Sequence, residues 1–255
     1  MLKIAIYTAI VDAYDAACHL GEDGPIDGID FFCFSDRSIQ LPTAVSFKPL
    51  TRTHKDPTRD ARNIKINGYR QFNDYDWVIW VDANCKINAK AIRAHLLACT
   101  TASAPIHVFS HDVRDCLFDE AQWAFSQAVD SPAIVSAQVN RYFKEGMPKK
   151  FGLANTNLLA RQPRQASVHA FSDTWWHELS RGSRRDQLSF DYVRWKQSTR
   201  VDYFPGLWFN SKFCVRVGEH ARPTKAASFN MIMLTEWCRR VVKANNLFRE
   251  VLYQD

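Results

Sequence analysis

The stretch YDWVIWVDANCKI, residues 75–87, decides the fold. Its apolar run at 77–81 is typical of a buried strand, and the run stops at Asp82, with Asn84 two residues later. In open α/β sheets, ligands bind beyond the carboxyl ends of the strands. Hard divalent cations bind oxygen ligands and share them with phosphates. The stretch therefore predicts a site for Mg²⁺ or Mn²⁺ beside a diphosphate, although a strand followed by a polar turn has the same pattern.

The flanking sequence alternates between strand-like and helix-like patterns. Expected strands cover residues 3–10, 29–35, 45–50, 75–82, 106–110, 151–160 and 201–205. Expected helices cover residues 57–72, 88–99, 117–129, 133–143, 165–181 and 186–197. This alternation predicts an α/β fold with helices on the faces of a sheet. The chain of 255 residues is long enough for one large domain or two small ones. We expect one domain over residues 1–225 and a helical extension over 226–255 that packs on it.

Composition narrows the class of protein. No apolar run reaches the roughly 20 residues of a membrane helix, and the start of the chain, MLKIAIYTAI, lacks the pattern of a signal peptide. We therefore expect a cytoplasmic protein, either free or at the inner face of the membrane. The seven cysteines are scattered and form no CxxC pair. That spacing favours small buried side chains over a zinc cluster or a disulfide framework.

The net charge of +6 suits nucleic acid, an anionic membrane surface or a phosphorylated small molecule. No RNA-recognition signature, helix-turn-helix or KH-type loop is present in the sequence, so we expect no nucleic-acid partner. The expected helix near the end of the chain carries basic residues between its apolar positions. A packing helix with a basic outer face is the simpler interpretation, and contact with a membrane surface or a partner protein is the alternative.

Six segments together resemble a known family. They are YTAIVDAYD (7–15), FFCFSD (31–36), DPTRDARNIKINGYRQF (56–72), WVDANCKI (80–87), HDVRDCLFDEA (111–121) and SRRDQLSFDYVRWK (183–196). The series is similar to the glycosyltransferase-like domain of plant mucilage-related proteins and bacterial surface-polysaccharide loci. The resemblance implies a GT-A-like sandwich with a mixed, mostly parallel sheet. It also implies a hexosyltransferase that uses a UDP-linked nucleotide-sugar donor and a carbohydrate or glycolipid acceptor.

The resemblance also implies roles for individual residues. Those expected to bind the nucleotide-sugar are Tyr7, Thr8, Ala9, Asp36, Arg62, Lys65, Asp82, His111 and Arg114. Arg62 and Lys65 lie one helical turn apart and would clamp the diphosphate together, although an exposed basic helix face has the same spacing. Asp36 would read the base or serve as a turn residue. Asp115 would line the sugar pocket or cap a loop.

The metal ligands implied by the resemblance are Asp82, Asn84 and His220. In this family of folds the strand ends in Asp-x-Asp, and here the second acid is replaced by the neutral Asn84. The change predicts a weaker site for Mn²⁺ or Mg²⁺, and it leaves open catalysis by cationic side chains without a metal.

The catalytic residues implied by the resemblance are Asp186, Gln187 and Arg185. Asp186 would bind sugar hydroxyls or act as a general base on the acceptor, whereas its position at a helix start also suits a simple N-cap. Aromatic faces suit sugar rings, so Trp175, Trp176 and Trp195 would build an acceptor platform, unless they belong to the core. Two other functions have a related sequence pattern: a nucleotidyltransferase, which needs a Gly-rich loop that is missing after the first strand, and a non-catalytic nucleotide-sugar or glycan-binding module.

Overall fold

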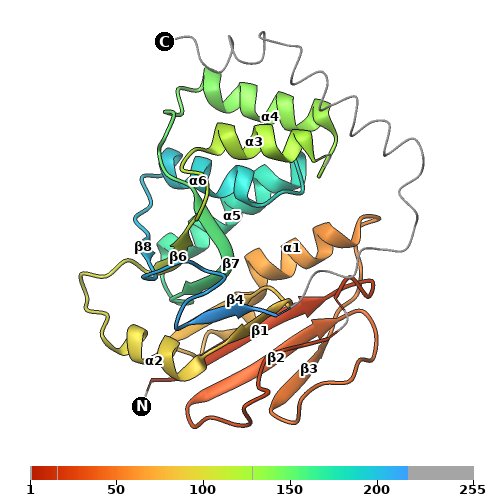
Figure 1. The fold of residues 1–255 in the computed structure, drawn as a ribbon, viewed down its shortest axis with the longest axis vertical. Helices are drawn as coiled ribbons and strands as arrows, with labels where there is room; N and C mark the ends of the chain where they lie inside the picture. Colours follow the sequence, from red (N-terminus) through yellow and green to blue (C-terminus); the bar gives the residue numbers. More distant parts are fainter. Residues whose placement is uncertain (1, 16, 128, 218–255) are drawn as a thin grey trace.

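The computed structural model describes residues 2–15, 17–127 and 129–217 (Figure 1). The expected C-terminal helix, His220 and the expected domain boundary at residue 225 lie outside the described residues. Within the described part of the chain, no helix is both long and apolar enough to cross a membrane.

The elements follow the expected alternation. The strands are β1 (Ile4–Ile10), β2 (Ile29–Ser35), β3 (Val45–Pro49), β4 (Trp77–Val81), β5 (Cys85–Ile87), β6 (Ile106–Ser110), β7 (Ala154–Arg161), β8 (Asp202–Tyr203) and β9 (Cys214–Arg216). The helices are α1 (Pro57–Asn67), α2 (Ala89–Leu97), α3 (Leu117–Ser126), α4 (Pro132–Lys144), α5 (Ala166–Arg181) and α6 (Gln187–Lys196), with a 3-10 helix at Gly68–Phe72.

Seven strands form one sheet in the order β3-β2-β1-β4-β7-β6-β8. All neighbouring pairs are parallel except those of β7, which runs antiparallel to both β4 and β6. Because β7 is reversed, its first residues lie beside the carboxyl end of β4, and the backbone N–H of Asp82 donates to Asn157 at 2.9 Å. The expected α/β fold with a mixed, mostly parallel sheet is confirmed.

Helices cover both faces of this sheet (Figure 1). Helices α1, α5 and α6 pack on one face, with α3 and α4 further out, and their apolar residues join one core with Tyr7, Val78 and Leu159. Helix α2 packs on the other face, where Ile92 and Leu96 join a second core with Ile79. Successive side chains of β4 face these two cores in turn. The whole strand is therefore buried, as expected of a central strand with helices packed on both faces of the sheet.

A buried hydrogen-bond network joins α1 to the middle of the sheet. Arg161 on β7 donates to the hydroxyl of Tyr7 at 2.6 Å and to the carbonyls of Ile66 and Lys65 at 2.7 Å. The Tyr7 hydroxyl in turn donates to the Lys65 carbonyl at 3.0 Å. Burial raises the pKa of Tyr7 to about 12, against the opposing charge of Arg161. The network fixes the carboxyl end of α1 over β1 and β7.

Removing the Tyr7 hydroxyl is therefore expected to affect the fold and not the ligand. Tyr7→Phe should lower the free energy of unfolding by about 1.5–3 kcal/mol, the range for a buried hydrogen bond to a charged group. Urea unfolding measures this loss. The matched control is Tyr75→Phe, whose hydroxyl donates to Asp30 near the surface at 2.9 Å, and which should cost less. A Tyr7→Phe protein of unchanged stability would contradict the assignment.

Candidate functional site

Lys65 lies at the centre of a buried charge cluster at the carboxyl end of β4. Its side chain is 1% exposed. The ammonium nitrogen lies 2.6 Å from Asp186 Oδ2, 3.0 Å from Thr156 Oγ1 and 3.5 Å from Asp82 Oδ1. Four segments that are far apart in the sequence thus meet at one point: helix α1, the end of β4, the start of β7 and the start of α6. We refer to Arg62, Lys65, Asp82, Thr156 and Asp186 as the charge cluster.

Arg62 is the more accessible cation of the charge cluster. Its Nε lies 3.2 Å from Asp186 Oδ1, and its side chain is 21% exposed. Burial opposes the charge of Arg62, but Asp186, Asp82, Tyr14 and Asp15 outweigh burial and raise its pKa. Arg62 and Lys65 therefore do not form the expected exposed pair of cations on one helix face. Lys65 points inward to two carboxylates, and Arg62 alone reaches partly to solvent.

Asp186 stands at the N-cap position of α6 but does not cap the helix. Its backbone is helical, with φ −61° and ψ −31°, and its side chain makes no capping hydrogen bond. The carboxylate instead accepts from Thr156 Oγ1 at 2.9 Å and pairs with Lys65 and Arg62. The interpretation of Asp186 as a simple N-cap is wrong, because both of its oxygens face cations.

The same cations decide what Asp186 can do chemically. Burial raises the pKa of a carboxyl, but Arg62, Lys65 and Arg185 outweigh it and hold the pKa of Asp186 well below its usual range. A general base works best when its pKa lies near the working pH. The geometry therefore favours Asp186 as a fixed anion that orients Arg62 and Lys65, and it disfavours proton abstraction by this carboxylate.

Asp82 and Asn84 follow β4 as expected, and both are largely buried. Trp80 Nε1 donates to Asp82 Oδ1 at 2.7 Å, on the same oxygen that faces Lys65. The thiol of Cys85 donates to Asn84 Oδ1 at 3.5 Å. One carboxylate and one amide oxygen fit the chemistry of a hard divalent cation. Because the ammonium of Lys65 already lies beside Asp82, a cation here would add to existing positive charge, which is consistent with weak binding.

A second group of charges surrounds Glu120, which is fully buried. Arg114 Nε donates to Glu120 Oε2 at 2.7 Å, and Arg185 Nε donates to Oε1 at 2.9 Å. Both guanidiniums lie over the ring of Trp123, at 5.0 and 5.2 Å. His111 lies alongside, with Nε2 3.9 Å from Glu120 Oε2. Glu120, which the sequence does not identify as a site residue, thus brings together three expected site residues, His111, Arg114 and Arg185.

The loop before α6 is fixed by partners from four other segments. Ser183 N donates to Gln138 Oε1 at 2.8 Å, and Arg184 N donates to Asp130 Oδ2 at 2.8 Å. The Arg184 side chain pairs with Asp56 at 3.1 Å. Its neighbour Arg185 pairs with Glu120. This anchoring explains why Asp186 points back toward α1 instead of capping its own helix.

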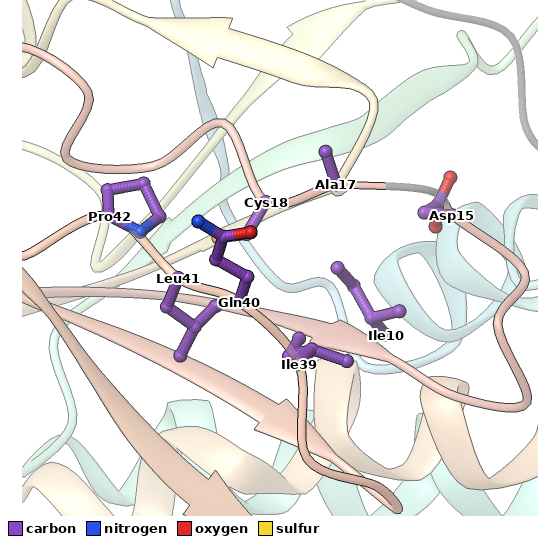
Figure 2. A pocket seen from close by; sticks show the side chains of 8 residues that line it. All are labelled: Ile10, Asp15, Ala17, Cys18, Ile39, Gln40, Leu41 and Pro42. Carbon is purple, nitrogen blue, oxygen red and sulfur yellow. The ribbon is translucent and has the colours of Figure 1, made fainter.

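A cavity of about 500 Å³ opens beyond the carboxyl ends of β1 and β2 (Figure 2). Its wall comes from the loops that follow these two strands, with Ile10, Cys18, Ile39 and Leu41 as apolar residues and Asp15 and Gln40 as polar ones. Figure 2 shows Gln40 in the middle of the lining residues, between Pro42 on one side and Ile10 and Asp15 on the other. Its volume and mixed lining are in the range of small-molecule sites.

The loop after β1 lines this cavity and has an unusual backbone conformation. Asp15 lines the cavity and also raises the pKa of Arg62. Two non-glycine residues of the loop, Asp12 and Ala13, have left-handed backbones with φ 57° and 51°. Asp36 holds this conformation, because its carboxylate accepts from Asp12 N at 3.1 Å. Asp36 thus has the structural role that the sequence allowed, and strained loops of this kind cluster at ligand sites.

Several expected site residues are buried in the structure outside the charge cluster. The side chains of Tyr7 and Thr8 are fully buried within β1, and Ala9 is 6% exposed. β1 continues to Ile10. Gln187 is buried, and its amide donates to the Ala154 carbonyl at 3.3 Å.

The expected acceptor platform is wrong for Trp175. This side chain is fully buried and lies edge-on to the ring of Phe190. Its Nε1 donates to the Asp186 carbonyl at 3.1 Å. Trp176 and Trp195 are partly buried against the same core. The position of Trp175 in the middle of α5, on its inner face, is the signal that could have indicated a core residue.

Comparison with known families identifies one match. The family model described as TOD1/MUCI70, glycosyltransferase-like domain, matches residues 47–214, which are 168 of the 255 residues. The matched range includes the whole charge cluster and the group around Glu120. No curated protein gives a significant match to the chain.

Proposed function

Because the chain belongs to the TOD1/MUCI70 glycosyltransferase-like domain family, we propose that it transfers a sugar from a UDP-linked donor to a carbohydrate or glycolipid acceptor. The setting proposed is surface-polysaccharide synthesis in the cytoplasm or at the inner face of the membrane. The site residues are those of the charge cluster, the group around Glu120 and the cavity beyond β1 and β2.

One observation carries this proposal. Asp186 gives up the capping of its own helix and pairs with Arg62 and Lys65 from a helix more than a hundred residues earlier in the chain. Desolvating several charges at one point is costly, and hydrophobic packing would serve stability as well or better. A buried cluster of charges beyond the end of a central strand is therefore typical of a site that acts on a charged substrate.

The cavity is proposed to hold the nucleoside of the donor. It lies beyond the carboxyl ends of β1 and β2, and β1 is the parallel neighbour of β4, whose carboxyl end carries Asp82. A donor lying from the cavity toward Asp82 would place its diphosphate beside the partly exposed guanidinium of Arg62. Arg62 would then stabilise the negative charge that gathers on the leaving diphosphate, while Lys65 and Asp186 hold Arg62 and Asp82 in place.

Asp82 and Asn84 are the residues that would hold Mn²⁺ or Mg²⁺. Bound there, the cation would supply further stabilisation of the leaving diphosphate. The group around Glu120 is proposed to face the sugar, where Arg114, Arg185 and His111 offer hydrogen-bond donors and the ring of Trp123 supports both guanidiniums.

Binding of UDP tests the proposal directly. We expect the purified protein to bind UDP by calorimetry, and to bind it more tightly with Mn²⁺ than with a chelator. The expected gain is modest, because Lys65 already lies beside Asp82. A variant that fills the cavity, Cys18→Trp, should weaken UDP binding by about tenfold or more, the effect of losing 1.4 kcal/mol of binding free energy. Absence of UDP binding under both conditions would reject the nucleotide-sugar function.

A non-catalytic nucleotide-sugar-binding module is the second candidate. It is favoured by the low pKa of Asp186, which leaves this acid unsuited to proton transfer, and by the neutral Asn84 in the metal motif. Donor hydrolysis separates the two functions. An enzyme releases UDP from a UDP-sugar slowly even without acceptor, and Arg62→Ala removes this release. A module binds the donor and releases none.

A further inference from the structure

Two histidines and a cysteine meet on the opposite face of the sheet from the charge cluster. His95 lies in the last turn of α2, Cys99 follows just beyond the helix end, and His107 is on β6. Among the residues that the structure describes, these are the one group of at least three His, Cys, Asp or Glu side chains whose ligand atoms lie within 4.8 Å of one another. His95 and Cys99 are partly buried and His107 is buried.

The distances between these side chains suit a tetrahedral metal site. His95 Nε2 lies 3.3 Å from His107 Nδ1. Two nitrogens bound to one tetrahedral Zn²⁺ at 2.0–2.1 Å are about 3.3–3.4 Å apart. Cys99 Sγ lies 3.9 Å from His107 Nε2, on the other side of the ring from His95, and its thiol donates to the His95 carbonyl at 3.6 Å. One ligand atom of each of the three residues lies within 4.8 Å of the others, so binding a metal at Nδ1 of His107 requires the Cys99 sulfur to move toward that nitrogen.

The second nitrogen of His107 is held in the way that metal-bound histidines require. His107 Nε2 lies 3.0 Å from the Ala104 carbonyl, which accepts a hydrogen bond from the Nε2–H tautomer. That tautomer leaves the lone pair of Nδ1 facing His95. A backbone carbonyl on the outer nitrogen is a common second partner of a metal-bound imidazole, and it fixes the orientation of the ring.

The surroundings keep both imidazoles neutral and shield the group. Trp77 contacts His107 edge-on at 5.0 Å, and Phe204 and Phe213 contact His95 at 4.7 and 5.5 Å. Burial lowers the pKa of His95 and of His107 and raises the pKa of the Cys99 thiol, so the thiol proton is the one that metal binding must displace. Neutral imidazole is the form that binds metals, so neither ring has to lose a proton at neutral pH.

We propose that His95, Cys99 and His107 bind one Zn²⁺, with water in the fourth position. Two imidazoles and a thiolate are borderline-to-soft ligands that select Zn²⁺ over Mg²⁺ or Mn²⁺. On binding, the Cys99 thiol loses its proton to solvent and a Zn–S bond forms, so one proton is released for each metal bound. The metal joins the end of α2 to β6, away from the charge cluster, and the proposal is independent of the proposed function.

The sequence alone does not predict this metal site. Its ligands are spaced His-x3-Cys followed by a histidine eight residues after the cysteine, and no CxxC pair announces them. His95 and Cys99 are four residues apart, but α2 ends at Leu97, so the spacing alone does not place both side chains on one helix face. Only the antiparallel packing of β7 between β4 and β6 puts His107 opposite them.

Titration of the metal-free full-length protein with Co²⁺ tests the proposal. One equivalent should produce a thiolate-to-cobalt charge-transfer band in the near ultraviolet and the strong visible bands of tetrahedral Co²⁺, and Zn²⁺ should displace both. Cys99→Ser and His95→Gln should each weaken Zn²⁺ binding by about 100-fold or more, since even the loss of an outer partner of a ligand costs 10–100-fold. The controls Cys116→Ser and His177→Ala, at a buried cysteine and an exposed histidine elsewhere, should bind Zn²⁺ as the unchanged protein does.

The alternative is a hydrogen-bonded pair of histidines beside an unreactive thiol. In that case Co²⁺ gives no charge-transfer band, or gives one that survives Cys99→Ser, and either result overturns the proposal. Because the substituted side chains of His95 and Cys99 are only partly buried, we expect both variants to fold. Thermal unfolding without metal checks this. Zn²⁺ should raise the unfolding midpoint of the unchanged protein and of Asp82→Asn, but not that of Cys99→Ser.

Discussion

Replacing Lys65 with methionine is expected to lower the free energy of unfolding by about 3–5 kcal/mol, because the change leaves buried carboxylates without their ammonium. Asp186 Oδ2 lies 2.6 Å from that ammonium, and Asp82 Oδ1 lies 3.5 Å from it. Methionine has a similar length and adds no cavity, so the loss reports charge and not packing. Urea unfolding at neutral pH measures it.

Two further variants show whether the loss arises from the charge cluster. Adding Asp186→Asn to Lys65→Met removes one of the orphaned charges, so the double variant should be more stable than the sum of the two single losses predicts. Lys86→Met is the matched control on the surface, where the ammonium lies 3.1 Å from Glu22, and it should leave stability nearly unchanged because an exposed ion pair contributes little. Additive losses in the double variant would mean that Lys65 and Asp186 do not depend on each other.

Replacing Asp82 with asparagine is expected to reduce sugar transfer by about 10²–10³-fold, because the variant loses the carboxylate that would hold the cation on the leaving diphosphate. Trp80 Nε1 donates to Asp82 Oδ1 at 2.7 Å, and the oxygen of the asparagine amide can still accept this hydrogen bond. Lys65 keeps Asp186 and Thr156 as partners. The fold should therefore persist, and the gain in UDP affinity from Mn²⁺ should vanish.

The matched control for this variant is Asp36→Asn. Asp36 also follows a strand, β2, but its carboxylate accepts from the backbone of Asp12. Its replacement should loosen the loop after β1 and leave the dependence on Mn²⁺ unchanged. Full turnover in a well-folded Asp82→Asn protein would remove Asp82 from the site.

The elements of the fold follow from local patterns, and their arrangement does not. The strands at 29–35 and 106–110 have the expected bounds, and the expected helix at 57–72 ends earlier, where a 3-10 helix begins at Gly68. The strand expected at 151–160 is present, but its antiparallel place between β4 and β6 has no signature in its sequence. The small β5–β9 sheet was missed, because each strand has only three residues.

The sequence predicts four of the five residues of the charge cluster as site residues, but it does not predict the partners that hold them. Asp82 and Asp186 stand out through a strand end and a specific string of residues. Thr156, Glu120 and Arg161 lie within ordinary strand and helix patterns, and only the packing of distant segments brings them to Lys65, Arg185 and Tyr7. Lys65 was expected to face a ligand because spacing on a helix identifies a face but not what covers it.

The reversed strand β7 has a consequence for synthesis of the chain. Strand β4 pairs with β1 on one side, and on the other side it pairs with β7, whose last residue, Arg161, follows Val81 by 80 positions. At translation rates of 5–20 residues per second, one edge of WVIWV stays unpaired for roughly 4–16 s. An uncharged apolar edge of this kind recruits other strands. Shielding of β4 on the nascent chain, more than stability of the finished sheet, is thus expected to limit the yield of folded protein.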